Sequence, residues 1–166
     1  MSGENKQDGP QFYGRRRGHK LRPNRQALID DFLPRLKVAV PEGGAPVDIG
    51  AMFTGPVSDI WLEVGFGGGE HLAAQAAAHP EIGFIGCEPF VNGVANLLSL
   101  IESEGLTNSR IFDEDARKLF PALPDACLAK VFALYTDPWP KKRHHRRRFI
   151  SDDTIKTLVR LLADGG

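Results

Sequence analysis

The sequence has little or none of several features that mark large classes of protein. It holds two cysteines in 166 residues, Cys87 and Cys127, far apart and in apolar surroundings, which favours reduced, buried thiols over a disulfide framework. No apolar run approaches the roughly 20 residues that a membrane-spanning helix needs, and the N-terminus lacks the apolar segment of a signal peptide. No spacing typical of metal ligands occurs. These absences predict a soluble, cytoplasmic protein with no membrane segment and no bound metal.

Net charge is also absent, because 21 Lys and Arg balance 21 Asp and Glu. The charges are nevertheless unevenly distributed. Residues 141–148 hold six Lys or Arg and no acid, and residues 1–37 hold nine Lys or Arg and four acids. The rest of the chain holds 6 basic and 17 acidic residues. An acidic body with two basic segments predicts salt-dependent binding of a polyanion such as a nucleic acid.

The chain divides into three parts, and its length favours one domain with a core of its own. We expect residues 1–22 to form a flexible basic N-terminal arm. The basic part of this arm is either a solvated segment or a functional one, which contacts phosphate or folds over the ligand site. Residues 23–57 are predicted to be an amphipathic helix, disturbed at Pro34, followed by a linker rich in Gly and Pro. Residues 58–166 form the main domain.

The main domain alternates short apolar runs with helical patterns. The expected strands are residues 60–64, 82–87, 109–112 and 130–135, and the expected helices are residues 70–78, 90–104, 116–120 and 151–165. Ser151 is a suitable N-cap for the last helix, whose apolar positions are Ile155, Leu158, Val159, Leu161 and Leu162. This alternation predicts an α/β fold with a parallel sheet covered by helices on both faces. In such folds, ligands bind beyond the carboxyl ends of the strands.

Each expected strand carries an acid at its carboxyl end: these are Glu63, Glu88, Asp115 and Asp137. The glycine-rich turn after the first strand lies between Glu63 and Glu70, so a pyrophosphate there would meet like charge. A cationic ligand is favoured. S-adenosylmethionine carries a sulfonium and an ammonium and no phosphate, and therefore suits these acids better than NAD does. Glu88 lies 19 residues after Gly69, a spacing at which a carboxylate accepts from ribose hydroxyls, and Asp115 is then placed for the adenine edge.

The stretch Asp137-Pro138-Trp139-Pro140 is followed by eight residues that are all basic or histidine. Proline restricts its own backbone and that of the residue before it, so we expect Asp137 and Trp139 to be held in defined directions. Trp139 either shapes a base pocket or belongs to the core. An oriented acid beside a cationic run indicates chemistry on a polyanion.

Three segments, residues 63–72, 85–88 and 137–148, closely resemble the bacterial tRNA (guanine-N7-)-methyltransferases, and the likeness extends from about residue 15 to residue 166. The resemblance implies the Rossmann-like fold of the class I S-adenosylmethionine-dependent methyltransferases. It also implies an enzyme that transfers a methyl group from S-adenosylmethionine to N7 of a guanine in tRNA, guanosine 46 of the variable loop. We favour a monomer.

The resemblance also assigns roles to residues. It makes Asp137 the catalytic acid. The implied cofactor-binding residues are Glu63, Gly65, Gly67, Gly69, Glu88, Asp115 and Asp137. The implied substrate-binding residues are Lys141, Arg143, His144, His145, Arg146, Arg147 and Arg148.

Two departures from the family pattern bear on these expectations. Thr136 stands where the family has Pro, which loosens the turn before Asp137. The sequence stops at Gly166, where the family continues with a fifth strand and a Thr-Asp pair that binds substrate. We therefore expect a C-terminally shortened domain in which the fourth strand is an exposed edge.

Two other functions stay open. A non-catalytic nucleic-acid-binding protein would keep the basic run but leave the four strand-end acids unexplained. An inactive fragment is a further alternative, because the expected sheet is incomplete. A dinucleotide-dependent oxidoreductase would use the glycine turn, but Glu70 and the cationic run disfavour it.

Overall fold

The structure is a computed structural model that describes residues 12–134 and 136–166, and the backbone but not the side chain of Arg146. Residues 1–11 of the predicted flexible arm lie outside the described residues. So does Tyr135, which we expected at the end of the fourth strand.

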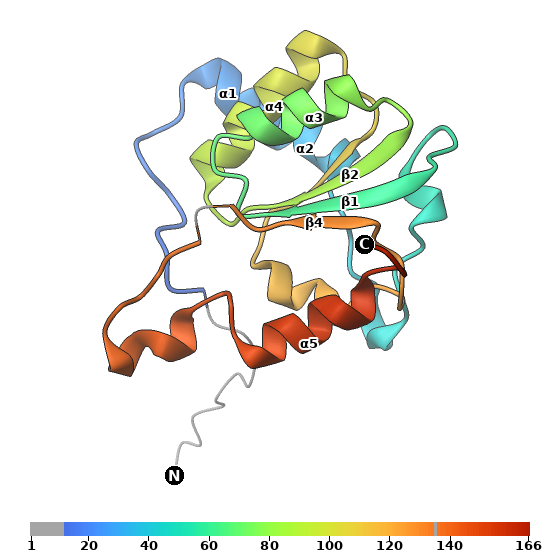
Figure 1. Ribbon diagram of the computed structural model, residues 1–166. Helices are drawn as coiled ribbons and strands as arrows, with labels where there is room; N and C mark the ends of the chain where they lie inside the picture. The colour runs from blue at the N-terminus through green and yellow to red at the C-terminus, as the bar shows by residue number, and fades with distance from the viewer. Residues whose placement is uncertain (1–11, 135) are drawn as a thin grey trace.

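Four parallel strands form one sheet in the order β3-β2-β1-β4 (Figure 1). The strands are β1 (Asp59–Val64), β2 (Ile82–Cys87), β3 (Ser109–Phe112) and β4 (Lys130–Phe132). The two central strands, β1 and β2, are apolar because both of their faces are covered, and Leu62 and Ile85 are fully buried. The predicted parallel sheet is confirmed.

The edge strand β4 is shorter than predicted. It pairs with β1 over three residues, from Trp61↔Lys130 to Glu63↔Phe132. In the described part of the chain it has no strand on its other side, as expected. Because β4 ends at Phe132, Asp137 does not directly follow the strand but lies on a segment without regular structure.

One face of the sheet is covered by α3 (Glu70–Ala78), α4 (Val91–Glu104) and the N-terminal helical segment (Figure 1). That segment consists of α1 (Pro23–Ala27), a π-helical turn (Leu28–Phe32) and α2 (Leu33–Leu36). The predicted disturbance at Pro34 takes this form: the π-helical turn lies directly before α2, whose second residue, Pro34, lacks the N–H that an uninterrupted α-helix would use.

The opposite face is covered by α5 (Asp152–Leu161) and two short 3₁₀ helices, η4 (Ala116–Lys118) and η5 (Phe120–Ala122) (Figure 1). The predicted linker also contributes to the core, because Val47 and Phe53 are buried on this side of the sheet. It also contains two single-turn 3₁₀ helices, Glu42–Gly44 and Gly50–Met52.

The predicted N-cap of α5 is confirmed, because the backbone N–H of Thr154 donates to Ser151 Oγ at 3.3 Å. The predicted apolar face of this helix is partly wrong. Leu158 and Leu161 are buried, whereas Ile155 is 46% exposed and Val159 is 69% exposed.

Candidate active site

A pocket of about 320 Å³ opens at the carboxyl edge of the sheet. Its walls come from the glycine turn, the ends of β2 and β3, the segment before the basic run and the N-terminal arm. It brings together three of the four predicted acids, Glu88, Asp115 and Asp137. The volume falls within the range of roughly 300–1,000 Å³ typical of small-molecule sites.

Glu88 joins the glycine turn to the start of α4. Its Oε2 accepts from the N–H of Gly67 and its Oε1 accepts from the N–H of Phe90, both at 2.9 Å. Gly67 has a φ of 57°, a conformation that favours glycine. Burial raises the pKa of the Glu88 carboxyl, and the two backbone hydrogen bonds lower it. Each oxygen has a second lone pair, so the carboxylate can still accept from a ligand hydroxyl.

The two other predicted glycines lie on either side of Gly67. Gly65 follows β1 and lines the pocket. Gly69 is the N-cap residue of α3 and is buried against Leu97 of α4. The glycine turn therefore places both the pocket wall and the first turn of α3.

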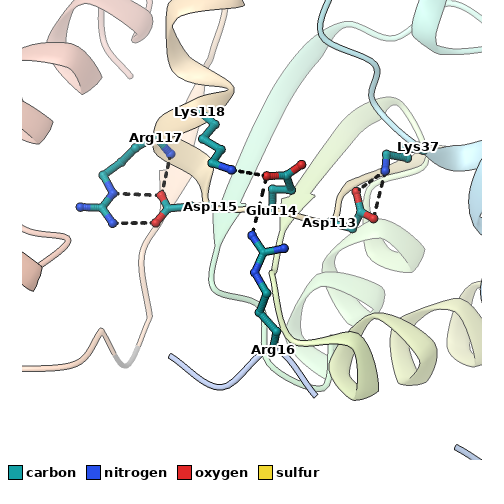
Figure 2. A network of polar contacts seen from close by, with 7 residues as sticks. All are labelled: Arg16, Lys37, Asp113, Glu114, Asp115, Arg117 and Lys118. Carbon is teal, nitrogen blue, oxygen red and sulfur yellow. Dashed lines mark hydrogen bonds and ion pairs between the residues drawn. The ribbon is translucent and has the colours of Figure 1, made fainter. Parts of the chain in front are cut away.

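Asp115 caps η4 and forms a bidentate ion pair with Arg117, a residue that sequence reasoning missed. The carboxylate accepts from Arg117 Nε at 2.9 Å and from Nη2 at 2.6 Å, and also from the Arg117 backbone N–H at 3.0 Å (Figure 2). Both residues line the pocket. The spacing Asp-x-Arg at the start of a helical turn is a sequence signal for such a cap.

The acids before Asp115 also have cationic partners, and two of these, Lys37 and Arg16, come from distant parts of the chain. Lys37 Nζ lies 2.8 Å from Asp113 Oδ1, and Glu114 pairs with Lys118 and, at 3.8 Å, with Arg16 of the N-terminal arm (Figure 2). The end of β3 thus binds both α2 and the arm.

The N-terminal arm lies across the edge of the pocket. The carbonyl of Arg16 accepts from the N–H of Val91, and the N–H of Gly18 donates to Asn92 Oδ1 at 2.8 Å. These bonds fix the arm to the first turn of α4, and residues 12–15 line the pocket. Of the roles that the sequence left open for the arm, this placement supports a segment folded over the ligand site.

Glu63 is the predicted acid that does not line the pocket. It is 4% exposed, and its Oε2 lies 2.7 Å from His71 Nδ1 of α3. The His71 ring packs edge-on against Phe132, with ring centroids 5.0 Å apart. Burial raises the pKa of the Glu63 carboxyl, and the contact with His71 lowers it. Sequence reasoning missed this pair, which joins β1 to α3.

Asp137 is exposed at the mouth of the pocket, between Thr136 and the turn that carries Trp139. Trp139 lines the pocket and packs edge-on against His144, with ring centroids 5.6 Å apart. The tryptophan therefore connects the pocket to the basic run.

The basic run forms a 3₁₀ helix, η6 (Lys142–Arg147), which was not predicted. Lys141, Lys142, Arg143 and His145 are exposed, and His144 is half-buried. Arg147 and Arg148 differ from these residues because their side chains turn back toward the pocket. The side chain of Arg146 lies outside the described residues.

Cys87 belongs to the pocket wall, and burial raises the pKa of its thiol, which stays neutral. Both cysteines are free, as predicted. Within residues 12–134 and 136–166, no cluster of three or more His, Cys, Asp or Glu could hold a metal ion. Over the same residues, no helix combines the length and the apolar character needed to cross a membrane.

Residues 58–166 match the family model described as "Putative methyltransferase". The fold is also similar to a solved structure titled "Structure of an Antibiotic Related Methyltransferase", with a TM-score of 0.53 over 75% of this chain and 65% of that one. The two sequences are 17% identical, so this likeness shows the fold alone. The predicted Rossmann-like class I methyltransferase fold is confirmed.

Curated relatives are much more similar in sequence. The tRNA (guanine-N(7)-)-methyltransferase of Paramagnetospirillum magneticum is 55% identical over 95% of this chain and 66% of its own length. That of Rhodospirillum rubrum is 52% identical over 93% and 62%, and that of Cereibacter sphaeroides is 49% identical over 95% and 68%. The chain thus spans about two thirds of the length of these relatives. By the match to the family model and by these identities, it belongs to the tRNA (guanine-N7-)-methyltransferase family.

Proposed function

We propose that the protein transfers a methyl group from S-adenosylmethionine to N7 of a guanine in tRNA, at guanosine 46 of the variable loop. The observation that carries this proposal is the shared pocket of Glu88, Asp115 and Asp137, which has a cationic helix at its mouth. Relatives that are named for this methyl transfer are 55% and 52% identical to the chain in sequence.

The pocket suits the cofactor in its hydrogen-bonding groups. When bound, S-adenosylmethionine supplies an electrophilic methyl group on a positively charged sulfur. Glu88 is positioned to accept from the ribose hydroxyls, because its two oxygens are already oriented by backbone N–H groups. Asp115 is held by Arg117 and would contact the adenine. Glu63, behind the glycine turn, is paired with His71 and does not line the pocket.

Guanine N7 is a lone-pair nucleophile with no proton to lose, so the reaction needs no strong general base. The work of the protein is positioning and electrostatic stabilisation. The exposed Asp137 carboxylate can accept from the guanine edge and offset the positive charge that the purine acquires. Trp139, in the same wall, can pack against a base that has left its stack.

The exposed side chains of η6 and of Lys141 are the proposed tRNA contacts. Lys141, Lys142 and Arg143 point into solvent next to Asp137 and Trp139. They can therefore bind phosphates on either side of a base in the pocket. His144, His145 and Arg146 stay proposed contacts from the resemblance.

The proposed methyl transfer can be tested by incubating the chain with tRNA and labelled S-adenosylmethionine and then mapping N7-methylguanine in the tRNA. We expect label at guanosine 46. Asp137→Asn should lower turnover by at least about 100-fold, because it removes a charge aimed at the reacting base, while tRNA retention on a filter stays close to wild type.

Asp59→Asn is the matched control, since Asp59 is exposed at the amino end of β1, the opposite edge of the sheet. Label at another atom or in protein, or full turnover by Asp137→Asn, would contradict the proposal. Retention of tRNA without any methyl transfer would favour the binding-only alternative.

A further inference from the structure

Arg148 is half-buried and binds protein carbonyls with its guanidinium, unlike the exposed cations that precede it. Its Nε donates to the carbonyl of Pro138 at 2.8 Å, and its Nη2 donates to the carbonyl of Trp139 at 3.2 Å. Two adjacent N–H groups of one planar fork thus bind two successive carbonyls. Lys141 and Lys142, by contrast, point into solvent.

The turn that Arg148 binds is the one that carries Asp137, and its backbone is strained. Trp139 has a φ of 39°, in the left-handed region that costs a non-glycine residue on the order of 1–2 kcal/mol. Such a conformation persists only where its surroundings fix it. The two hydrogen bonds from Arg148 are placed to fix the Trp139 conformation, because they hold the carbonyls on both sides of the Trp139 N–H.

The residues on either side of Arg148 make it a rigid support. Arg147 places its Cζ 4.5 Å from the centroid of the Tyr13 ring and 5.0 Å from that of the Trp139 ring. Phe149 packs edge-on against Phe120, with centroids 6.2 Å apart, at the border of the buried core. Arg148 therefore extends from an anchored backbone to the turn.

We propose that Arg148 is a positioning residue: its guanidinium fixes the Pro138–Trp139 turn, and through it the direction of the Asp137 carboxylate. For Arg148 this role replaces the phosphate contact expected from the sequence. The inference deepens the proposed function and rests on it for its kinetic consequence.

Arg148→Lys separates the two roles, because it keeps the positive charge and removes the fork. We expect turnover to fall roughly 10- to 100-fold, since a small misplacement of a reacting group has an effect of this size. The KM for tRNA, the tRNA dissociation constant and its salt dependence should stay at the wild-type values. Arg35→Lys is the matched control, because Arg35 is an exposed arginine on α2, and it should leave turnover unchanged.

Arg148→Ala gives the opposite test. If Arg148 contacted a phosphate, Arg148→Ala would lower the slope of log K against log salt by about 0.7–0.9. Arg148→Lys would then keep the wild-type slope. A lower slope in Arg148→Ala, or full turnover by Arg148→Lys, would overturn the inference.

Solution NMR tests the same inference without catalysis, and so keeps it distinct from a failure of the proposed function. The three-bond coupling between the amide and α protons of Trp139 depends on its φ, and we expect it to change in Arg148→Lys while the signals of α5 keep their wild-type positions, which also shows that the variant is folded. An unchanged coupling would overturn the positioning role even in a protein that transfers no methyl group.

Discussion

At the scale of single residues, two of the three buried carboxylates that were predicted for the site, Glu63 and Glu88, are satisfied in different ways. Glu88 accepts two backbone N–H groups and faces the pocket. Glu63 meets one imidazole, His71, and is covered by α3. Because water is largely excluded from Glu63, its charge depends on that one partner.

This environment predicts how stability depends on pH. Burial raises the pKa of Glu63 above its usual range near 4.3. As pH rises from that usual value toward the raised one, the folded state binds more protons than the unfolded state, so stability falls. Glu63→Gln removes this loss. The free energy of unfolding of the variant, relative to wild type, should therefore be constant below the usual pKa and increase as pH rises above it.

Urea denaturation of both proteins from about pH 3.5 to about pH 7 measures this difference. Glu81→Gln is the control, since Glu81 is an exposed glutamate whose Oε1 lies 3.6 Å from His79 Nδ1, and exposed pairs contribute little. A Glu63→Gln difference that does not change with pH would contradict the prediction.

At the scale of elements, the site depends on close packing of α4 against the glycine turn. A Cβ built on Gly93, inside α4, would lie 2.1 Å from the carbonyl oxygen of Gly67. That oxygen is backbone and cannot rotate away. The absence of a side chain at Gly93 therefore lets Glu88 reach the N–H of Gly67.

Gly93→Ala should destabilise the protein even though alanine favours helix by about 1 kcal/mol. Overpacking costs about 1–3 kcal/mol, so we expect a net loss of about 1 kcal/mol, measured by urea denaturation. S-adenosylmethionine should bind at least about 10-fold more weakly by calorimetry, because the turn is pushed away from Glu88.

Ser99→Ala, in the same helix, is the matched control, because it raises helix propensity without approaching the turn. An unchanged affinity in Gly93→Ala would show that the turn adjusts without harm to the pocket.

At the scale of the whole molecule, charge is segregated. The exposed cations at the start of the basic run lie beside a pocket whose wall holds three acids and three arginines, Arg15, Arg117 and Arg147. A polyanion is therefore attracted to the side of the pocket that carries the exposed cations.

This segregation predicts the salt dependence of tRNA binding. Replacing Lys141, Lys142 and Arg143 together by Ala should reduce the slope of log K against log salt by about two, since each phosphate contact contributes about 0.7–0.9. Lys156→Ala is the control, because Lys156 is an exposed lysine on α5, away from the basic run. Filter binding at several salt concentrations measures the slopes. Equal slopes for the triple variant and wild type would exclude these three side chains as phosphate contacts.

The sequence predicted the regular elements well where the apolar pattern within the element was enough to define it. β2 and β3 were predicted with their observed bounds, and α4 with its end at Gly105. It predicted α5 less well, because Ile155 and Val159 fit a helical stripe by spacing but are exposed in the structure. Periodicity gives the relative positions of residues on a helix, and the neighbouring elements decide which stripe is buried.

By itself, the sequence determined the parallel sheet, the glycine turn, the acids near the strand ends and the basic run, because each depends on residue type and local spacing. Only the tertiary structure decided which acids share the pocket. Glu63 is still within β1, where side chains alternate between the faces of the sheet, and so it faces His71. Glu88 lies beyond β2 and faces the ligand site. The inward turn of Arg148 and the docking of the arm were decided in the same way, because each requires partners that only folding brings near.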